Sequence, residues 1–328
     1  MHFPLYHRPN SLVFLDDDAS YLEMLALVMP NDWGVRFFTH VDDCLAHFAH
    51  QHALWETDVW HHQQLVEHWR AGKPLIPSIF EYWTANHHRY GLSQSCVVDF
   101  AMPAMTGIEF LKKLPVFPAS RVLLTGKADE QIAIAAFNEG LISKFVPKQH
   151  PDIGRHLTAI LSEQHQRPMD FYEAIWRSAL KKEQYAAVHE PTVQLALHNW
   201  AREKKWVEYV VLPAPFGILA LDTYANAHWL QLELRSDLSS AADLAQSTGQ
   251  SSAVVQKIRQ GTHFVNTELL MALGSSDDAH TAPSFGLGFA EGLLGAFFPL
   301  AANKTYGMGH SEFLTRLPSR AGSSESQF

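Results

Sequence analysis

The fold is decided by one stretch in the first half of the chain, Val97-Val98-Asp99-Phe100-Ala101-Met102-Pro103-Ala104-Met105-Thr106-Gly107-Ile108-Glu109. An apolar run ends here in a single carboxylate, and a Met-Pro turn and a glycine follow before a helix with an apolar face begins. Short continuous apolar runs are typical of strands that are buried in a parallel sheet. The stretch therefore predicts that Asp99 lies at the carboxyl end of a buried strand, where open α/β sheets place their chemistry.

Length, composition and charge narrow the class of protein. The 328 residues favour two domains over one. Apolar residues make up 47% of the chain and charged residues 18%, which is ordinary for a globular protein with a substantial core. The net charge is -9, and both halves carry more acidic than basic residues. Neither half has the broad positive field of a strong nucleic-acid binder, although the net charge does not exclude a local basic patch.

Cysteine usage and the N-terminal residues indicate a compartment. The chain has two cysteines, Cys44 and Cys96, and Cys96 falls in the predicted buried strand. A disulfide framework is therefore not expected, and the pattern fits a reducing cytosol. The first residues lack the apolar segment of a signal peptide, and no apolar run is long enough to cross a membrane. We expect a cytoplasmic protein.

Strands and helices alternate on both sides of the Asp99 strand. Apolar strands are predicted at 11–15, 35–38, 121–126 and 144–148, with helices between them and a last helix over 152–164. This alternation predicts an α/β domain with a doubly wound parallel sheet of five strands. Polar side chains stand at or just after most of these strand ends, namely Asp16 and Asp17, Asp99, Thr125 and Lys148.

The order of these strand ends suits phosphoryl transfer, which depends mainly on positioning and on charge stabilisation. Asp99 would be the nucleophile. The adjacent acids at 16–18 repel one another unless a cation lies among them, and carboxylates are ligands that Mg²⁺ prefers. Taken alone, these acids are better explained as a solvated turn that caps the next helix. With the other strand ends, we expect Mg²⁺ on Asp17 and Asp99, with Asp16 acting through water, and the phosphoryl oxygens on Thr125 and Lys148.

Residues about 10–155 resemble the receiver domain of two-component response regulators, which has a flavodoxin-like fold. The resemblance is carried, in family order, by the acidic pair after the first strand, by D-F-A-M-P-A-M-T-G-I-E, by L-L-T-G and by G-L-I-S-K-F-V-P-K. It implies a switch phosphorylated by a histidine kinase or a phosphotransfer protein, with no enzymatic activity beyond autophosphatase activity. It also implies that phosphorylation leads to homodimer formation. The residue roles that it implies are the phosphoacceptor Asp99, the Mg²⁺ ligands Asp16, Asp17, Asp99 and the backbone carbonyl of Ala101, the switch residues Thr125 and Phe145, and the phosphate-binding Lys148.

The sequence departs from the receiver pattern at three places. Thr106 stands where the family usually has Asp. Gln149 follows Lys148 where the family usually has Pro, and Pro147 precedes it, which predicts a differently shaped loop. An insertion over about 50–94 separates the second helix from the Asp99 strand. None of these departures removes a chemical group that the phosphoryl-transfer site requires.

The insertion is rich in Trp and His. Its apolar spacing predicts two helices separated by Gly72-Lys73-Pro74, which form a hairpin that lengthens the second receiver helix. We favour packing against the parent domain over a partner surface, because Trp is highly buried on average. The histidines between 47 and 88 lack the cysteines or acids that would complete a zinc site, so none is expected there. The aromatic anchors are Trp55, Trp60, Trp69 and Trp83.

The second half predicts a different domain. With the receiver domain at 1–165, an α+β output domain covers 166–317 and a disordered tail covers 318–328. Helices are predicted over 170–182 and 191–204. Three antiparallel strands at 207–212, 216–221 and 229–234 form a small sheet. No output family is identified, although some quorum-sensing response regulators also combine a receiver with an unusual output domain, which is an analogy of architecture alone.

Residues 239–273 are predicted to be helical, and 242–260 have the spacing of a helix-turn-helix. In that interpretation Gln256, Lys257 and Arg259 reach base edges. We favour the alternative in which the two helices cover the small sheet, because the domain is acidic and short helix pairs often show this spacing. The glycine-rich segment 284–298 lacks a following Lys-Ser/Thr, so it is no phosphate loop. It fits either close backbone packing or self-association.

Three functions of the output domain therefore stay open. The first is control of dimerisation or of partner binding by phosphorylation. The second is transcriptional control through 242–260. The third is an enzymatic or small-ligand domain on the sheet at 207–234, which ranks last because no nucleophile-base pair and no metal motif stands there.

Overall fold

The computed structural model describes residues 2–318 except 104, 116–118, 127–129, 166–168, 289–291 and 301–304. The chain forms two compact units, and each is built from three segments. The parallel-sheet unit comprises Pro9–Asp58, His88–Arg167 and Ser311–Phe328. The antiparallel-sheet unit comprises Met1–Arg8, Val59–His87 and Pro168–His310. The tail expected over 318–328 lies outside the described residues apart from Pro318.

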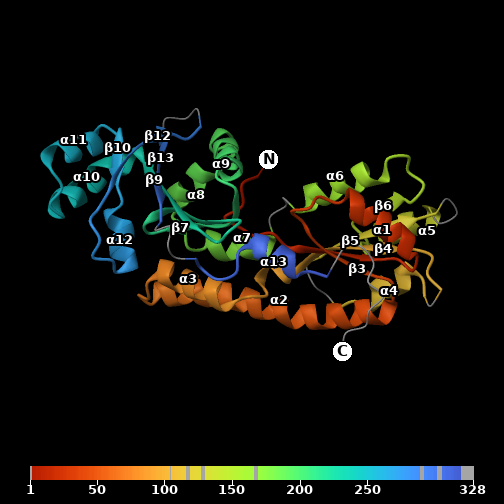
Figure 1. The fold of residues 1–328 in the computed structure, drawn as a ribbon. Coiled ribbons are helices and arrows are strands. Elements are labelled where there is room, and N and C mark those ends of the chain that lie inside the picture. Colours follow the sequence, from red (N-terminus) through yellow and green to blue (C-terminus); the bar gives the residue numbers. More distant parts are fainter. Residues whose placement is uncertain are drawn as a thin grey trace. The chain divides into compact units, whose positions relative to one another are not determined.

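The parallel-sheet unit has the predicted α/β architecture (Figure 1). Its strands lie in the order β3-β2-β4-β5-β6 and all pair in parallel. Because the strands are parallel, their carboxyl ends meet at one edge of the sheet, where polar groups gather. The strands are β2 (Ser11–Leu15), β3 (Gly34–Phe38), β4 (Ser93–Asp99), β5 (Ser120–Thr125) and β6 (Lys144–Pro147). The helices are α1 (Ala19–Val28), the start of α2 (Val41–Arg70), α4 (Gly107–Lys113), α5 (Glu130–Asn138) and α6 (Ile153–His165).

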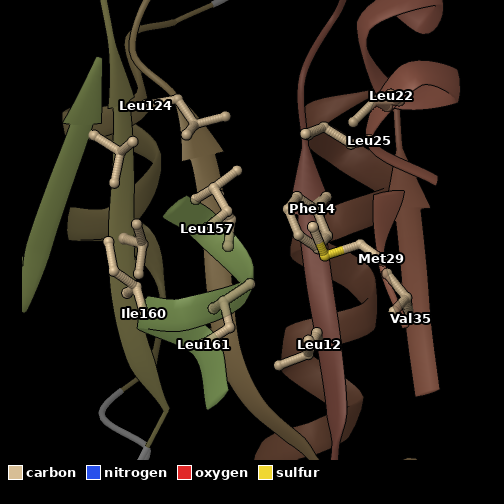
Figure 2. Close-up of a cluster of buried hydrophobic side chains, with 13 residues drawn as sticks. Leu12, Phe14, Leu22, Leu25, Met29, Val35, Leu124, Leu157, Ile160 and Leu161 are labelled. Carbon is tan, nitrogen blue, oxygen red and sulfur yellow. The ribbon is translucent and has the colours of Figure 1, made fainter. Parts of the chain in front are cut away.

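Helices α1 and α6 bury their apolar residues against one face of this sheet (Figure 2). Alternate residues of β2 point to this face, and helix residues one turn apart meet them. Leu12 and Phe14 of β2 are fully buried, as are Leu25 of α1 and Leu157 and Leu161 of α6. This packing holds the strands in register and so fixes the positions of the groups that follow them.

The insertion is helical, as expected. Helix α2 runs unbroken from Val41 to Arg70, and α3 (Leu75–Ala85) follows a turn at Gly72, whose φ is 97°. The boundary between the two units lies within α2, after Asp58, so the second half of the insertion belongs to the antiparallel-sheet unit. The reason is packing: α3 buries Ile76 and Trp83 there, and Phe80 stacks on Tyr306 with ring centroids 3.7 Å apart.

The expected tryptophan anchors differ in burial. Trp55 and Trp83 are buried, which agrees with a packing role. Trp60 is 55% exposed and Trp69 is half-buried. Packing against the parent domain is therefore confirmed for Trp55, but it is wrong for Trp83, which is buried in the antiparallel-sheet unit. The Trp60 side chain lies largely in solvent.

The antiparallel-sheet unit contains the three predicted strands within a larger sheet of six, in the order β1-β7-β8-β9-β13-β12. The additional strands come from two segments for which the sequence predicted no strand in this sheet. The N-terminal β1 pairs with β7, and the glycine-rich segment supplies β12 and β13. The Phe285 ring and the Leu287 side chain approach Gly295 closely. A Cβ added at Gly295 would lie 3.1–3.2 Å from them, so close packing explains why glycine stands here. The strands are β1 (Tyr6–His7), β7 (Trp206–Pro213), β8 (Phe216–Asp222), β9 (Ala227–Leu234), β12 (Phe285–Gly286) and β13 (Leu293–Pro299).

Two expected helical segments are interrupted in this unit. The helix expected over 170–182 ends at Arg177, and a second one begins at Lys182. The helical stretch expected over 239–273 is broken at Gly261, whose φ is 67°, and a short strand pair forms there. The elements are α7 (Asp170–Arg177), α8 (Lys182–Val188), α9 (Pro191–Glu203), α10 (Leu238–Ser247), α11 (Ser252–Arg259), β10 (His263–Val265), α12 (Thr267–Leu273) and β11 (Thr281–Pro283). The last helix, α13 (His310–Arg316), belongs to the parallel-sheet unit except for His310.

Candidate functional site

The carboxyl edge of the parallel sheet brings the predicted strand-end residues together. Asp99 is the last residue of β4, and Thr125 is the last residue of β5. Asp16 and Lys148 directly follow β2 and β6. Backbone hydrogen bonds continue the ladder past the strand ends, since the Asp16 N–H donates to Phe38 O at 3.1 Å and the Lys148 N–H donates to Thr125 O at 2.9 Å. The sheet itself therefore positions these side chains.

The Lys148 ammonium lies between two buried carboxylates. Its Nζ is 2.6 Å from Asp16 Oδ2 and 2.9 Å from Asp99 Oδ1. The Asp16 side chain is fully buried, so its charge is stabilised mainly through this contact. Burial raises the pKa of Asp16 above its ordinary value, although Lys148 and the Asp18 N–H oppose that effect. Burial alone would lower the pKa of Lys148, but the contacts with Asp16 and Asp99 raise it overall.

The three adjacent acids have separate roles. Asp18 is the N-cap of α1, and its Oδ1 accepts hydrogen bonds from the Ser20 N–H at 3.0 Å and the Tyr21 N–H at 3.1 Å. The helix-capping alternative is thus correct for Asp18. Asp16 is buried and Asp17 is exposed, and one carboxylate oxygen from each lies within 4.8 Å of one from Asp99. Three converging carboxylates are a donor set that suits a hard divalent cation.

Gly107 lets the loop after β4 fold back over Asp99. The Gly107 N–H donates to Phe100 O at 2.9 Å. A Cβ at this position would collide with the backbone oxygen of Asp99 and would lie 3.0 Å from Leu123 Cδ1. Ala101 is exposed in this loop and forms an isolated antiparallel bridge with Thr106. The role of the Ala101 carbonyl as a metal ligand stays a prediction.

Thr106 replaces the usual acid without loss of its capping function. The Glu109 N–H donates to Thr106 Oγ1 at 3.2 Å, and the Thr106 N–H donates to Glu109 Oε2 at 2.8 Å. This reciprocal pair is a capping box that begins α4. The first departure from the receiver pattern is therefore structurally compensated.

The loop around Lys148 also keeps the lysine in place. Its backbone turns after β6, where the His150 N–H donates to Pro147 O at 3.0 Å. The ammonium reaches both Asp16 and Asp99 despite the unusual Pro147 and Gln149 on either side of the lysine.

The two expected switch residues lie on neighbouring strands. Thr125 is fully buried, and its Oγ1 has no hydrogen-bond partner among the residues that the structure describes. An unsatisfied buried hydroxyl is costly, so this group is available to a new acceptor. Phe145 is half-buried on β6 and pairs in register with Leu123 of β5. The roles of both as switch residues stay predictions.

Tyr21 is a site residue that the sequence interpretation missed. Lys148 Nζ lies 4.7 Å from the centroid of its ring, a distance typical of a cation–π contact. Burial raises the pKa of its hydroxyl strongly, and the charges of Asp16 and Asp99 add to this effect. In the sequence Tyr21 reads as part of the apolar face of α1. The one sequence feature that could have pointed to Tyr21 is its position one helical turn after the acidic residues at 16–18.

The three residues that the helix-turn-helix interpretation assigns to base contacts all lie on α11. Gln256 and Lys257 are exposed, whereas Arg259 is 3.1 Å from Asp243 of α10 in an ion pair. Ala245 of α10 and Ile258 of α11 are buried, and both line a cavity that Gln231 and Glu233 of β9 also line. The helix pair thus packs beside the sheet, as in the favoured alternative. Contact of Gln256, Lys257 and Arg259 with nucleic acid stays a prediction.

The two cysteines are free, as expected. Cys44 and Cys96 are both buried, and burial raises the pKa of each thiol far above its ordinary value. Buried protonated thiols are unreactive, so both cysteines act as packing groups. Within the described parts of the chain, no helix is both long and apolar enough to cross a membrane.

Comparisons with known proteins support the fold assignment. No family model matches the chain, and no curated protein matches it. Among solved structures, the Legionella pneumophila response regulator LqsR is similar over 99% of this chain and 100% of its own, with 23% identity and a TM-score of 0.70. A response regulator receiver domain protein from Clostridium thermocellum is 16% identical over 48% of this chain and 95% of its own, with a TM-score of 0.33. The likeness to the Legionella protein extends over both units, and it confirms the receiver fold together with an α+β second unit.

Proposed function

We propose that this chain is a cytoplasmic response regulator of a two-component phosphorelay, with Asp99 as its phosphoacceptor. The observation that carries the proposal is the position of Lys148, whose ammonium lies 2.9 Å from Asp99 Oδ1 and 2.6 Å from Asp16 Oδ2. A lysine in this place neutralises a buried acidic pair in the resting protein and remains beside any group that Asp99 acquires. The phosphodonor is a histidine kinase or a histidine phosphotransfer protein.

The transfer step follows from the nucleophile and its neighbours. A carboxylate oxygen of Asp99 forms a bond to the phosphorus atom, and the bond from phosphorus to the donor histidine nitrogen breaks. The electron pair of that bond stays on the imidazole, which then takes up a proton. The transferred group places negative charge beside Lys148, so the ammonium can exchange one carboxylate contact for a phosphoryl oxygen. Such a reaction relies on positioning and on charge stabilisation.

The acidic residues at this edge fit Mg²⁺. Asp16, Asp17 and Asp99 contribute carboxylate oxygens within 4.8 Å of one another, and hard divalent cations prefer oxygen ligands. These three residues and the backbone carbonyl of Ala101 would hold the ion. When bound, Mg²⁺ supplies positive charge that offsets the charge of the phosphoryl oxygens. Asp16 is the ligand most affected by Lys148, because both would share its buried carboxylate.

The response to phosphorylation would begin at Thr125. Its buried hydroxyl lacks a described hydrogen-bond partner, so a phosphoryl oxygen at Asp99 offers it an acceptor. Movement of Thr125 lets Phe145 of β6 repack, because β5 and β6 are adjacent in the sheet. The surface formed by α5, β6 and α6 then changes its affinity for a second copy of the chain or for a partner. Phosphorylation would thus control dimerisation or partner binding.

The test is phosphate transfer from a labelled donor. Wild type incubated with Mg²⁺ and a labelled small-molecule phosphodonor should incorporate phosphate, and Asp99→Ala should not. Glu23→Ala is a matched acidic control, because the Glu23 side chain is exposed on α1. Labelling of Asp99→Ala at the wild-type level would overturn the assignment of the phosphoacceptor.

A further inference from the structure

A second group of metal-ligand side chains lies in the antiparallel-sheet unit, away from Asp99 in the sequence. It consists of His2, Glu173 and His189, whose candidate ligand atoms all lie within 4.8 Å of one another. His2 precedes β1, Glu173 lies on α7, and His189 is the C-cap of α8. Residues from three distant parts of the sequence therefore converge on one point.

The spacing of these atoms suits a small transition-metal ion. Glu173 Oε1 is 3.2 Å from His189 Nε2 and 3.7 Å from His2 Nε2. Ligands bound to Zn²⁺ at about 2.0–2.1 Å in tetrahedral geometry are roughly 3.3 Å apart. The two distances to Glu173 lie on either side of that value. Two histidines and one carboxylate leave a fourth position for water.

The atoms that face one another are not satisfied by hydrogen bonds. Glu173 Oε1 and His189 Nε2 are buried, and neither has a hydrogen-bond partner within the described part of the chain. They are close enough for an ion pair but are not aligned as donor and acceptor. Buried polar atoms without partners are rare in folded proteins. An ion between them would satisfy both.

The remaining atoms of the three side chains are held by neighbours. The Leu5 N–H donates to Glu173 Oε2 at 3.0 Å, which turns Oε1 toward the histidines. His189 Nδ1 lies 3.0 Å from Tyr185 O, and a carbonyl can only accept, so Nδ1 carries the hydrogen and Nε2 has the free lone pair. His2 Nδ1 lies 3.3 Å from the Gln194 side-chain amide, and with that amide flipped so that its oxygen faces the ring, Nδ1 would donate to it and leave the lone pair on Nε2. Such outer contacts orient the ligands of metal sites.

We propose that His2, Glu173 and His189 bind one Zn²⁺ ion, which fastens the residues ahead of β1 to helices α7 and α8. The fastening has a clear structural use. Strand β1 pairs with β7 through two residues, Tyr6 opposite Val210 and His7 opposite Tyr209. The residues ahead of this short strand are already packed, since Phe3 and Leu5 are fully buried and the Val211 N–H donates to Leu5 O at 2.8 Å. A metal ion at His2 would add to that hold. This site shares no residue with the one around Asp99.

The test is a Zn²⁺ titration of the full chain without a terminal tag, in competition with a chromogenic chelator. Wild type should bind one equivalent tightly, and Glu173→Gln and His189→Gln should each weaken that site at least tenfold. The other histidines of this His-rich chain are expected to bind Zn²⁺ more weakly. His87→Gln and His88→Gln are matched controls, because both side chains are exposed, and they should keep the tight site.

Two further readouts separate binding from folding. Zn²⁺ should raise the Tm of wild type and slow hydrogen exchange at residues 5–8, and it should do neither in Glu173→Gln. If His189→Gln does not fold, His2→Gln takes its place, because the His2 side chain is 38% exposed. Equal Zn²⁺ affinity in wild type and Glu173→Gln, or no tight equivalent in wild type, would overturn the proposal and identify an ordinary histidine–carboxylate contact.

Discussion

The Lys148 ammonium lies 2.6 Å from the buried carboxylate of Asp16, and it is also within 2.9 Å of Asp99. One cation thus balances two carboxylates that are almost completely shielded from water. Removing one partner of a buried ion pair is costly because the remaining charge is left uncompensated. The stability of the parallel-sheet unit should therefore depend on Lys148, and a divalent cation should be able to replace it.

The first prediction concerns Lys148→Ala. Loss of the ammonium should destabilise the protein by about 3 kcal/mol at pH 8, because Asp16 and Asp99 then repel each other in a buried place. Burial would then raise the folded-state pKa of Asp16 further, so the loss should be smaller at pH 5, where Asp16 can bind a proton. Urea unfolding at the two pH values measures this difference. Addition of Mg²⁺ at pH 8 should recover much of the stability, and a variant unaffected by pH and Mg²⁺ would contradict the account.

The second prediction concerns Gly107→Ala. The added methyl group would collide with the backbone oxygen of Asp99, so the loop after β4 must move. Such overpacking costs about 1–3 kcal/mol, and displacement of Asp99 should slow phosphate incorporation. Gly286→Ala is the control, because a Cβ there would meet nothing within 4 Å. Equal unfolding free energies and equal labelling rates for the two variants would refute the close approach.

The third prediction separates the ring of Tyr21 from its hydroxyl. The ring lies beside Lys148, whereas the hydroxyl is buried and has no hydrogen-bond partner in the described structure. Tyr21→Phe keeps the ring and removes the unsatisfied group, so it should be neutral or stabilising by about 1 kcal/mol. Tyr21→Leu removes the cation–π contact and should slow phosphate incorporation. The rates of labelling of the two variants decide between ring and hydroxyl, and a slow Tyr21→Phe would show that the hydroxyl acts.

The fourth prediction concerns pH and Glu233 in the antiparallel-sheet unit. Burial raises the pKa of Glu233 to about 7, with the charges of Glu268 and Asp237 adding to the effect and the Gln231 amide opposing it. A carboxyl with a raised folded-state pKa favours the folded protein when protonated. Its contribution is therefore complete below the unfolded-state pKa near 4.5 and is lost as the pH rises through about 7.

Glu233→Gln should remove that pH dependence. The neutral amide should stabilise the protein at pH 8 by on the order of 2 kcal/mol and should change little at pH 5. Unfolding curves of wild type and variant at the two pH values give the comparison. Glu203→Gln, an exposed carboxylate on α9, is the matched control and should leave the pH dependence unchanged. The same pH profile in wild type and Glu233→Gln would show that this carboxyl is already ionised.

The parallel sheet and its site were predictable because their signals are local. Each strand is a short apolar run, and the groups at its end stand beside it in the sequence, as Asp16 stands after Leu15 and Lys148 after Pro147. The alternation of strands and helices then places all of these ends at one edge. Tyr21 escaped notice because its contact with Lys148 joins residues far apart in the chain, and its pattern is that of a helix face.

The antiparallel-sheet unit was only partly predictable, since much of it depends on contacts between distant segments. Strand β1 has two residues and no detectable period, and its partner β7 lies about two hundred residues later in the register that pairs Tyr6 with Val210. The glycine-rich segment gave no strand alternation, although it forms β12 and β13. The cluster of His2, Glu173 and His189 also joins residues that are not adjacent in the sequence, so no motif with a fixed spacing predicts it.

Whether Asp99 receives the phosphoryl group at the carboxyl edge of the parallel sheet can be read from the protein itself. We would incubate the wild type with Mg²⁺ and a phosphodonor, measure its intact mass and map the modified peptide. One phosphoryl group per chain is expected, located in the peptide that contains Asp99 and absent from Asp99→Asn. A phosphoryl group on another residue of the wild type, or the same modification in Asp99→Asn, would show that Asp99 is not the phosphoacceptor.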